Sequence, residues 1–151
     1  MAPTDLLSRL RARHWRLSAQ RRAVAEVLAG DHVHLTAEQV HDLARERLPE
    51  ISRATVYNTL NELVAMGELA IVDVVDGPKR YDPNVTAHHD HLVCEGCHAI
   101  RDVPRSTPPP RVSGSAAGGF LLTGVEVTYR GLCPECARRH GLPAAHATRD
   151  R

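Results

Sequence analysis

Aromatic side chains are scarce in this 151-residue chain, where they make up only 3% of the residues. A core must therefore be built mainly from Leu, Val, Ile and Ala. No apolar run approaches the ~18 residues that a membrane-spanning helix needs, so we expect no membrane association. The N-terminal stretch MAPTDLLSRLRARHWRL has no apolar h-region, which predicts a cytoplasmic protein and not a secreted one.

Neither sign of charge dominates, since 19 Lys and Arg stand against 18 Asp and Glu. This balance excludes a polybasic nucleic-acid coat but leaves room for a local basic patch. The first 25 residues hold such a patch, in which Asp5 is the acidic residue and the arginines are Arg9, Arg11, Arg13, Arg16, Arg21 and Arg22. We expect these arginines to reach DNA phosphates. The enzyme signatures GxxxxGK(S/T), HExxH and the HxE of zinc deaminases are missing, so we predict that the chain is not an enzyme.

Helical patterns fill the first half of the chain, beginning with a stripe of Leu6, Leu7 and Leu10. Three further helices each have a capping residue and a terminator: Ser18 to Gly30, Thr36 to Pro49, and Ser52 to Gly67. Thr36 with Gln39 has the spacing of a capping box. The residues expected to face inward on these helices are Ala23, Val24, Val27, Leu28, Val40, Leu43, Ala44, Leu48, Val56, Leu60, Leu63 and Val64.

A β-hairpin is predicted after the helices. The run Leu69–Val75 is rich in β-branched residues, and an Asp76-Gly77 turn leads from it into Lys79–Tyr81. Helices followed by a two-stranded hairpin have the element order of a winged helix. We therefore predict a winged-helix DNA-binding domain with its hinge in residues 1–82.

The Ser52–Met66 helix is the predicted recognition helix. Its outer face suits the major groove, because Arg binds guanine, Asn pairs with adenine, and Tyr and Ala pack on thymine methyl groups. The predicted DNA contacts are Arg53, Ala54, Tyr57, Asn58 and Asn61 on this helix, with Arg16 and Arg21 from the basic patch. The alternative is an ordinary solvated helix face.

The second half of the chain has a β pattern. The predicted strands are His88–Val93, Ala99–Val103, Phe120–Leu122 and Val125–Tyr129, and the Pro- and Gly-rich stretch Pro104–Gly119 is predicted to be a loop. We expect a small domain in residues 83–140 and a flexible tail in residues 141–151.

Four cysteines fall in two C-x-x-C pairs that are separated by 35 residues. Without an export signal, this spacing favours a metal site over a disulfide framework. Four thiolates around tetrahedral zinc leave no position for a substrate, so we predict a structural zinc site at Cys94, Cys97, Cys133 and Cys136. A half-chain of about 70 residues needs such a stabilising metal site, because its apolar core alone gives only marginal stability. A redox-active thiol pair is the alternative.

Histidines gather just before the first cysteine pair, in the run His88-His89-Asp90-His91. If Cys94–Cys97 is the turn of an antiparallel hairpin, His89 lies opposite Asp102 and His91 lies opposite Ile100. The side chains of His89, His91 and Asp102 then converge on one face, while His88 and Asp90 point to the other.

Two further residues can join this group, namely Asp82 at the start of the second half and His34 from the helical half. Three imidazoles and two carboxylates form a mixed nitrogen and oxygen donor set. Such a set suits Fe(II) or Mn(II) better than a second structural zinc. Surface histidines and ordinary loop carboxylates are the alternative.

The motifs HLTAE, SRATVYNTL, KRYD, HHDHLVCEGC, IRDV and YRGLCPEC, in this order, resemble those of the ferric uptake regulator (Fur) family over residues ~5–137. The resemblance implies an α+β homodimer. Its winged helix would bind double-stranded operator DNA with an A/T-rich palindrome, and a small α/β domain with a structural zinc would dimerise. It places the zinc on the four cysteines and a regulatory Fe(II) or Mn(II) at the domain junction, on His34, Asp82, His89, His91 and Asp102.

Within that family, Asp82, Asp102 and Asn58 resemble the peroxide-sensing PerR/CatR-like branch. The stretch GFLLTGVEVTYRGLCPEC is similar to actinobacterial regulators associated with catalase genes. The resemblance implies that Fe(II) reacts with hydrogen peroxide, that oxygen is added to His34 or His89, and that operator DNA is released. The alternatives are a metal-uptake repressor responding to Fe, Mn or Zn, and a thiol-redox zinc switch.

The chain departs from the family in one segment. Arg105–Gly124 contains no Asp or Glu, and Val125 stands where some relatives carry a histidine of an additional metal site. We therefore predict no functional third site, which leaves His88 and Asp90 without an assigned role. The segment also lacks the usual helix pattern of the family's dimerisation domain.

Overall fold

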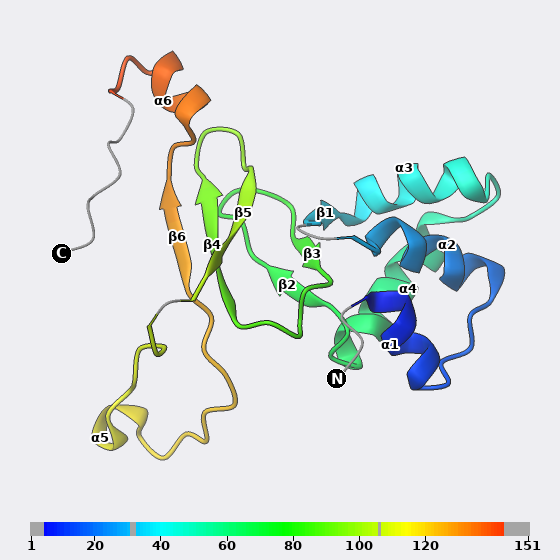
Figure 1. Ribbon diagram of the computed structural model, residues 1–151, viewed down its shortest axis with the longest axis horizontal. Helices are drawn as coiled ribbons and strands as arrows, with labels where there is room; N and C mark the ends of the chain where they lie inside the picture. Colours follow the sequence, from blue (N-terminus) through cyan, green and yellow to red (C-terminus); the bar gives the residue numbers. More distant parts are fainter. Residues whose placement is uncertain (1–4, 31–32, 106, 144–151) are drawn as a thin grey trace. The chain divides into compact units, whose positions relative to one another are not determined.

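The computed structural model describes residues 5–30, 33–105 and 107–143. It divides into two compact units, Met1–Ala87 and His88–Arg151. The first unit combines helices with a small sheet, and the second is built on another small sheet (Figure 1). The α+β class with an N-terminal winged helix is confirmed. The domain limits 1–82 and 83–140 stay predictions, and most of the predicted tail 141–151 lies outside the described residues.

Capping residues begin the helices of the first unit, at the three predicted positions and at Asp5, which was not predicted. The helices are α1 (Leu6–Ala12), α2 (Ala19–Leu28), α3 (Ala37–Arg47) and α4 (Arg53–Ala65), with N-caps at Asp5, Ser18, Thr36 and Ser52. At α3 the capping box is complete, because Gln39 N donates to Thr36 Oγ1 at 3.1 Å and Thr36 N donates to Gln39 Oε1 at 2.9 Å. Gly67, with φ +73°, lets the chain turn away from α4.

The core of the first unit is aliphatic, as the scarcity of aromatic residues requires. Its buried members include Leu6, Leu10, Val24, Leu28, Val40, Ala44, Val56, Leu60 and Leu63. The prediction for Leu43 is wrong, because this side chain is 36% exposed. His41 is buried in its place and completes the i, i+3, i+4, i+7 stripe of α3 with Ala37, Val40 and Ala44. Val27, Leu48 and Val64 are only partly buried against the core.

A three-stranded antiparallel sheet completes the winged helix, in the order β1-β3-β2. Its strands are β1 (Leu35–Thr36), β2 (Ala70–Val72) and β3 (Arg80–Asp82), and Tyr81 at its centre pairs with Leu35 and Ile71. The predicted strand Leu69–Val75 is thus shorter than expected. β1 escaped prediction because two residues are too few to show an alternating pattern.

The second unit holds a mixed sheet in the order β5-β4-β6 (Figure 1). β4 (His89–Cys94) is antiparallel to β5 (Ile100–Pro104) and parallel to β6 (Thr128–Gly131). The predicted register is wrong by two residues, because His91 lies opposite Asp102. The turn is longer than assumed: Cys94 N donates to Ala99 O at 2.9 Å, and His98 takes a positive φ of 60°. A two-residue shift keeps every side chain on its predicted face.

The connection between β5 and β6 is mostly irregular, as predicted for Pro104–Gly119. It contains one short helix, α5 (Gly114–Ala117), which is capped by Ser113. The strand predicted at Phe120–Leu122 is wrong, since these residues are not in a strand and are 80%, 90% and 54% exposed along the chain. The unpredicted helix α6 (Pro134–Arg139) follows β6. Within the described ranges, no helix combines the length and apolarity needed to cross a membrane.

Candidate metal centres and DNA-contact surface

The cysteine sulfurs meet at one end of the second unit's sheet. Cys94 ends β4, Cys97 lies in the turn that follows, and Cys133 and Cys136 lie at the N-terminus of α6. Their four Sγ atoms all lie within 4.8 Å of one another, and those of Cys97 and Cys133 are 3.8 Å apart. Tetrahedral zinc with sulfurs at about 2.3 Å places neighbouring sulfurs about 3.8 Å apart. The four cysteines therefore fit a closed, structural zinc site.

The ionisation of these thiols also favours a bound cation. Burial raises the pKa of Cys94, but hydrogen bonds from backbone N–H groups, led by that of Cys133, outweigh burial and lower this pKa to about 6. Hydrogen bonding with the Cys133 side chain, together with burial, raises the pKa of Cys136 to about 12. Thiols this close cannot all ionise by themselves. A divalent cation that binds all four thiolates removes the conflict.

Gly96 lets the two cysteine pairs approach each other. A Cβ at this position would lie 2.9 Å from Sγ of Cys136 and 3.0 Å from its Cβ. The first cysteine turn must therefore pass the second with no side chain between them. The glycine in Cys94-Glu-Gly-Cys97 is a sequence signal for this close approach.

A second group of metal-binding side chains lies on one face of β4 and β5. His89 Nε2 and His91 Nε2 are 3.1 Å apart, and Oδ1 of Asp102 lies 3.7 Å from the first and 3.8 Å from the second. The register of the hairpin brings these three predicted ligands together, because His91 pairs directly with Asp102. Two imidazole nitrogens and a carboxylate form three of the five predicted Fe(II) or Mn(II) ligands.

The other two predicted ligands lie in the first unit. Nε2 of His34 is 3.6 Å from Oδ2 of Asp82, and both side chains are buried. His34 directly precedes β1 and Asp82 ends β3, the strand that pairs with β1. A turn fixes the carboxylate of Asp82, since Oδ1 accepts a hydrogen bond from Asn84 N at 2.8 Å. A buried imidazole beside a buried carboxylate is again a donor set for Fe(II) or Mn(II).

The predicted recognition face of α4 is exposed along its length, at Arg53, Ala54, Tyr57, Asn58 and Asn61. A groove of about 190 Å³ lies beside it, lined by Tyr57 of α4 and by Pro78 and Lys79 of the hairpin. Some of the predicted contacts have partners within the chain. Arg53 pairs with Glu38 at 2.8 Å.

The basic patch of the first 25 residues is only partly available. Arg16 is exposed, whereas Arg21 pairs with Glu62 at 2.6 Å and stacks on Trp15. The expectation that Arg9 reaches phosphates is wrong, because Arg9 is 7% exposed and bound to Glu68. Sequence analysis missed Glu68, although a lone acidic residue between α4 and a hydrophobic strand is a signal for a buried ion pair.

Asp90 also has a partner that the sequence analysis did not name. Its carboxylate is buried on β4, and Oδ1 lies 2.7 Å from Nε and 2.6 Å from Nη2 of Arg105. A guanidinium therefore neutralises the face of β4 opposite to His89 and His91. The absence of a functional third metal site stays a prediction.

A winged helix with an exposed polar recognition face, together with a tetrathiolate site and imidazole–carboxylate groups, defines a metal-dependent DNA-binding regulator of transcription. The chain belongs to the ferric uptake regulator family, whose model matches residues 12–112. Members of this family are transcriptional regulators and not enzymes; they bind operator DNA, act as dimers, and use structural zinc with regulatory Fe or Mn.

The similar proteins include one with a Fur-type name and others that are named for their response to peroxide. The chain is 35% identical over 134 residues to the transcriptional regulator FurA of Mycobacterium tuberculosis, covering 88% of this chain and 90% of that protein. It is 30% identical over 137 residues to the peroxide-responsive repressor PerR of Staphylococcus aureus, covering 87% and 89%. The structure of the Campylobacter jejuni peroxide stress regulator matches with a TM-score of 0.61 at 26% identity, covering 87% of this chain and 98% of that one.

Proposed function

We propose that this chain is a peroxide-responsive repressor, which acts in the cytoplasm on peroxide-defence genes such as those for catalase. The observation that carries the proposal is its donor set, which contains imidazoles and aspartates and no thiolate: His89, His91 and Asp102 in one unit, His34 and Asp82 in the other. The similarity to a peroxide-responsive repressor supports it.

In this proposal all five side chains hold one regulatory ion. His34 and Asp82 belong to the DNA-binding unit, and the other three belong to the second unit. An ion that binds both sets favours the one arrangement of the units in which all five ligands meet. That arrangement presents the two α4 helices of the dimer at one operator spacing.

Fe(II), when bound, would act as a catalyst that activates hydrogen peroxide close to the ligands, while the imidazole ring supplies the two electrons that reduce the peroxide. In the balanced overall change, peroxide transfers one oxygen atom to an imidazole ring and its remaining atoms leave as water. We place this change on His34 or His89. An oxidised imidazole is a poor ligand, so the preference for the DNA-binding arrangement is lost and the operator is released. Mn(II) at the same ligands supports DNA binding without this change.

The operator is proposed to be an A/T-rich palindrome. A twofold dimer presents two equivalent α4 helices, so the two half-sites mirror each other. Asn58 and Asn61 suit adenine, while Tyr57 and Ala54 suit thymine methyl groups. Lys79 of the hairpin lines the same groove as Tyr57 and would contact the phosphate backbone.

A metal-uptake repressor is the second candidate, favoured by membership of the ferric uptake regulator family. It uses the same ligands, but loss of the metal ends repression and no residue is oxidised. A thiol-redox switch at the zinc site is the third, in which peroxide oxidises the cysteines and releases zinc.

One experiment separates the three candidates. The anaerobic protein is loaded with Fe(II) or Mn(II), treated with stoichiometric hydrogen peroxide, and digested for peptide mass spectrometry, while thiols are titrated and DNA binding is followed by fluorescence anisotropy. We expect one added oxygen on His34 or His89 in the Fe(II) sample alone, with thiols intact and DNA released.

The matched control is His88→Ala, which alters the exposed neighbour of His89 without touching a proposed ligand. This variant should still bind DNA with Mn(II) and release it with Fe(II) and peroxide, whereas His89→Ala should lose metal-dependent binding. An Fe(II)-loaded protein that keeps unmodified histidines is a metal-uptake repressor, and one that loses thiols and zinc is a thiol switch.

A further inference from the structure

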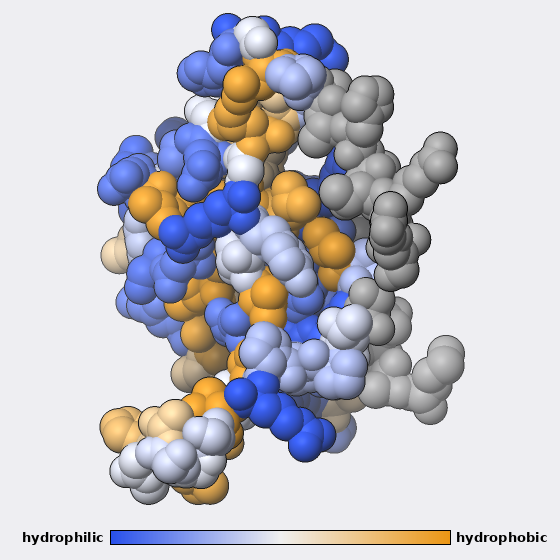
Figure 2. Space-filling view, turned by 90° about the vertical axis from the view of Figure 1, so that its left-hand side faces the viewer, coloured by the Kyte–Doolittle hydropathy of each residue, from blue (hydrophilic) through white to orange (hydrophobic). Residues whose placement is uncertain are grey.

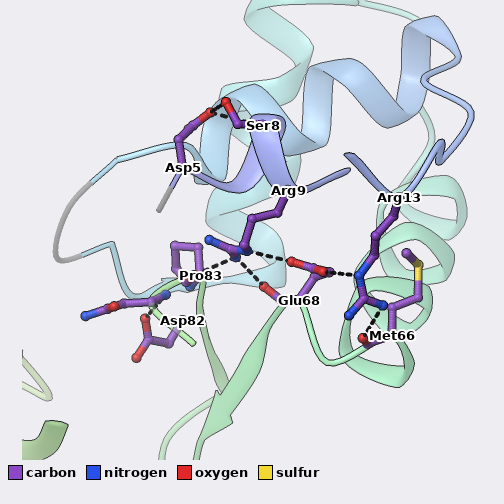
Figure 3. A network of polar contacts seen from close by, with 9 residues as sticks. Asp5, Ser8, Arg9, Arg13, Met66, Glu68, Asp82 and Pro83 are labelled. Atoms are coloured by element: carbon purple, nitrogen blue, oxygen red, sulfur yellow. Dashed lines mark hydrogen bonds and ion pairs between the residues drawn. The ribbon is translucent and has the colours of Figure 1, made fainter. Parts of the chain in front are cut away.

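Arg9 of α1 lies inside the first unit and joins two distant segments of it (Figure 3). Its Nε donates to Oε2 of Glu68 at 2.7 Å, and its Nη2 donates to the backbone carbonyl of Glu68 at 3.1 Å. The same Nη2 donates to the carbonyl of Pro83 at 2.9 Å. One planar guanidinium thus holds the chain just after α4 and the chain just after Asp82, a geometry that suits Arg and not Lys.

Glu68 is the centre of this group. It is 3% exposed, and its second oxygen forms an ion pair with Nε of Arg13 at 2.7 Å. Arg13, one turn beyond Arg9 on the same face of α1, also donates to the carbonyl of Met66 at 3.1 Å. A buried carboxylate requires such charged partners. The group of Arg9, Arg13 and Glu68 therefore fastens α1 to the C-terminal end of α4.

The two arginines differ in their burial and in their carbonyl partners. Both bind Glu68, but the contact with the carbonyl of Pro83 belongs to Arg9. Pro83 is buried and follows Asp82 directly, while Asn84 N donates to the Asp82 carboxylate. Arg9 therefore holds the residue that directly follows a proposed ligand of the regulatory metal.

We propose that Arg9 is a positioning residue that transmits metal binding at Asp82 to the recognition helix. The inference rests on the proposed regulatory site, though not on its reaction with peroxide. A change in the position of Asp82 displaces the Pro83 carbonyl, which pulls on the guanidinium of Arg9. The guanidinium is bonded to Glu68, so the end of α4 responds. Binding of the metal and binding of the operator thus favour the same placement of α1.

The test measures operator affinity by fluorescence anisotropy with and without saturating Mn(II), for the full-length wild-type chain and for Arg9→Gln. The dissociation constant without Mn(II), divided by the dissociation constant with Mn(II), reports the coupling between metal binding and operator binding. We expect this ratio to fall by roughly 3- to 30-fold in Arg9→Gln, in the range of residues that carry coupling, with the Mn(II)-free affinity close to that of wild type. By reciprocity, the operator should also strengthen Mn(II) binding less in the variant, which calorimetry checks.

Arg13→Gln is the matched control, because it removes a partner of Glu68 and leaves the Pro83 contact in place. It should lower the melting temperature but change the ratio less than twofold. If Arg9→Gln does not fold, Arg9→Lys keeps the charge beside Glu68 while losing the planar geometry, and it should still lower the ratio.

The outcomes distinguish the two proposals. A wild-type chain whose operator affinity ignores Mn(II) contradicts the regulatory site itself. If the wild type responds to Mn(II), two results would overturn the role of Arg9 while leaving the regulatory site in place. The Arg9 variants would either keep the wild-type ratio or lose operator affinity equally with and without Mn(II).

Discussion

The pair of Asp90 and Arg105 shows how strongly one buried charge depends on its partner. The side chains are 8% and 13% exposed. Removing one member of such a pair leaves an uncompensated charge in the interior. We expect Arg105→Gln to lower the free energy of unfolding by about 3 kcal/mol, measured by urea denaturation of the zinc-loaded protein.

Arg101→Gln, at an exposed position of β5, is the control for that measurement and should cost less than about 0.5 kcal/mol. The double variant Asp90→Asn/Arg105→Gln should recover part of the loss, because no charge then stays buried. Equal losses for Arg105→Gln and Arg101→Gln would show that the pair contributes nothing to stability.

Gly96 allows a second residue-scale prediction, about zinc. In Gly96→Ala the new methyl group meets the sulfur of Cys136, so the two cysteine pairs must separate. We expect faster loss of zinc to a chelator, followed with a zinc-sensitive dye. Gly131→Ala on β6 is the control, since a Cβ there meets no atom within 4 Å. Similar rates for the two variants would contradict the close approach.

At the scale of elements, α4 carries the prediction for DNA. Asn58 lies on its exposed face, and a base contact of this kind contributes about 1–3 kcal/mol of discrimination. Asn58→Ala should weaken binding to the specific operator by that amount and leave binding to a random duplex unchanged, measured by anisotropy at fixed salt. A uniform loss on both duplexes would mean that Asn58 contacts the backbone and reads no base.

Elements with a local signal were predictable from sequence. The caps at Ser18, Thr36 and Ser52 identified three helices, because capping depends on neighbours within one turn. The prediction of a strand at Phe120–Leu122 was wrong because residues with high β-propensity form a strand only beside a partner strand, which a sequence does not reveal.

The candidate sites divide in the same way. His89, His91 and Asp102 were grouped correctly despite the wrong register, since alternation along a strand survives a two-residue shift. The bond of Arg9 to Glu68 joins residues 59 positions apart, and nothing in the local pattern pairs them. Long-range polar pairs of this kind require the structure.

At the scale of the whole molecule, the family's dimeric state bears on the exposed apolar segment Phe120–Leu122 of the second unit. Hydrophobic surface is visible among polar residues on the face drawn in Figure 2. Phe120 and Leu121 are 80% and 90% exposed in the single chain, as expected for residues covered by a second copy.

We therefore expect Leu121→Glu to weaken dimerisation by about two orders of magnitude, because two copies of a buried leucine are lost and two charges are placed in the interface. Sedimentation equilibrium measures this effect. Val75→Glu, at a 50% exposed position of the first unit, is the control and should leave the dimer intact. A dimer that tolerates Leu121→Glu would place its interface elsewhere.

The cysteine cluster closes a loop of chain that runs from Cys97 through β5, the long connection and β6 to Cys133. Cys97 precedes this connection and Cys133 follows it, with their sulfurs 3.8 Å apart. A protease that cuts the backbone after Arg111 would therefore leave two fragments held together by the zinc and by the pairing of β4 with β6. Such a nicked protein should migrate as one species until it is chelated and denatured. Insertions and deletions in the connection should be tolerated for the same reason. We therefore expect related proteins to differ in length most readily in this segment.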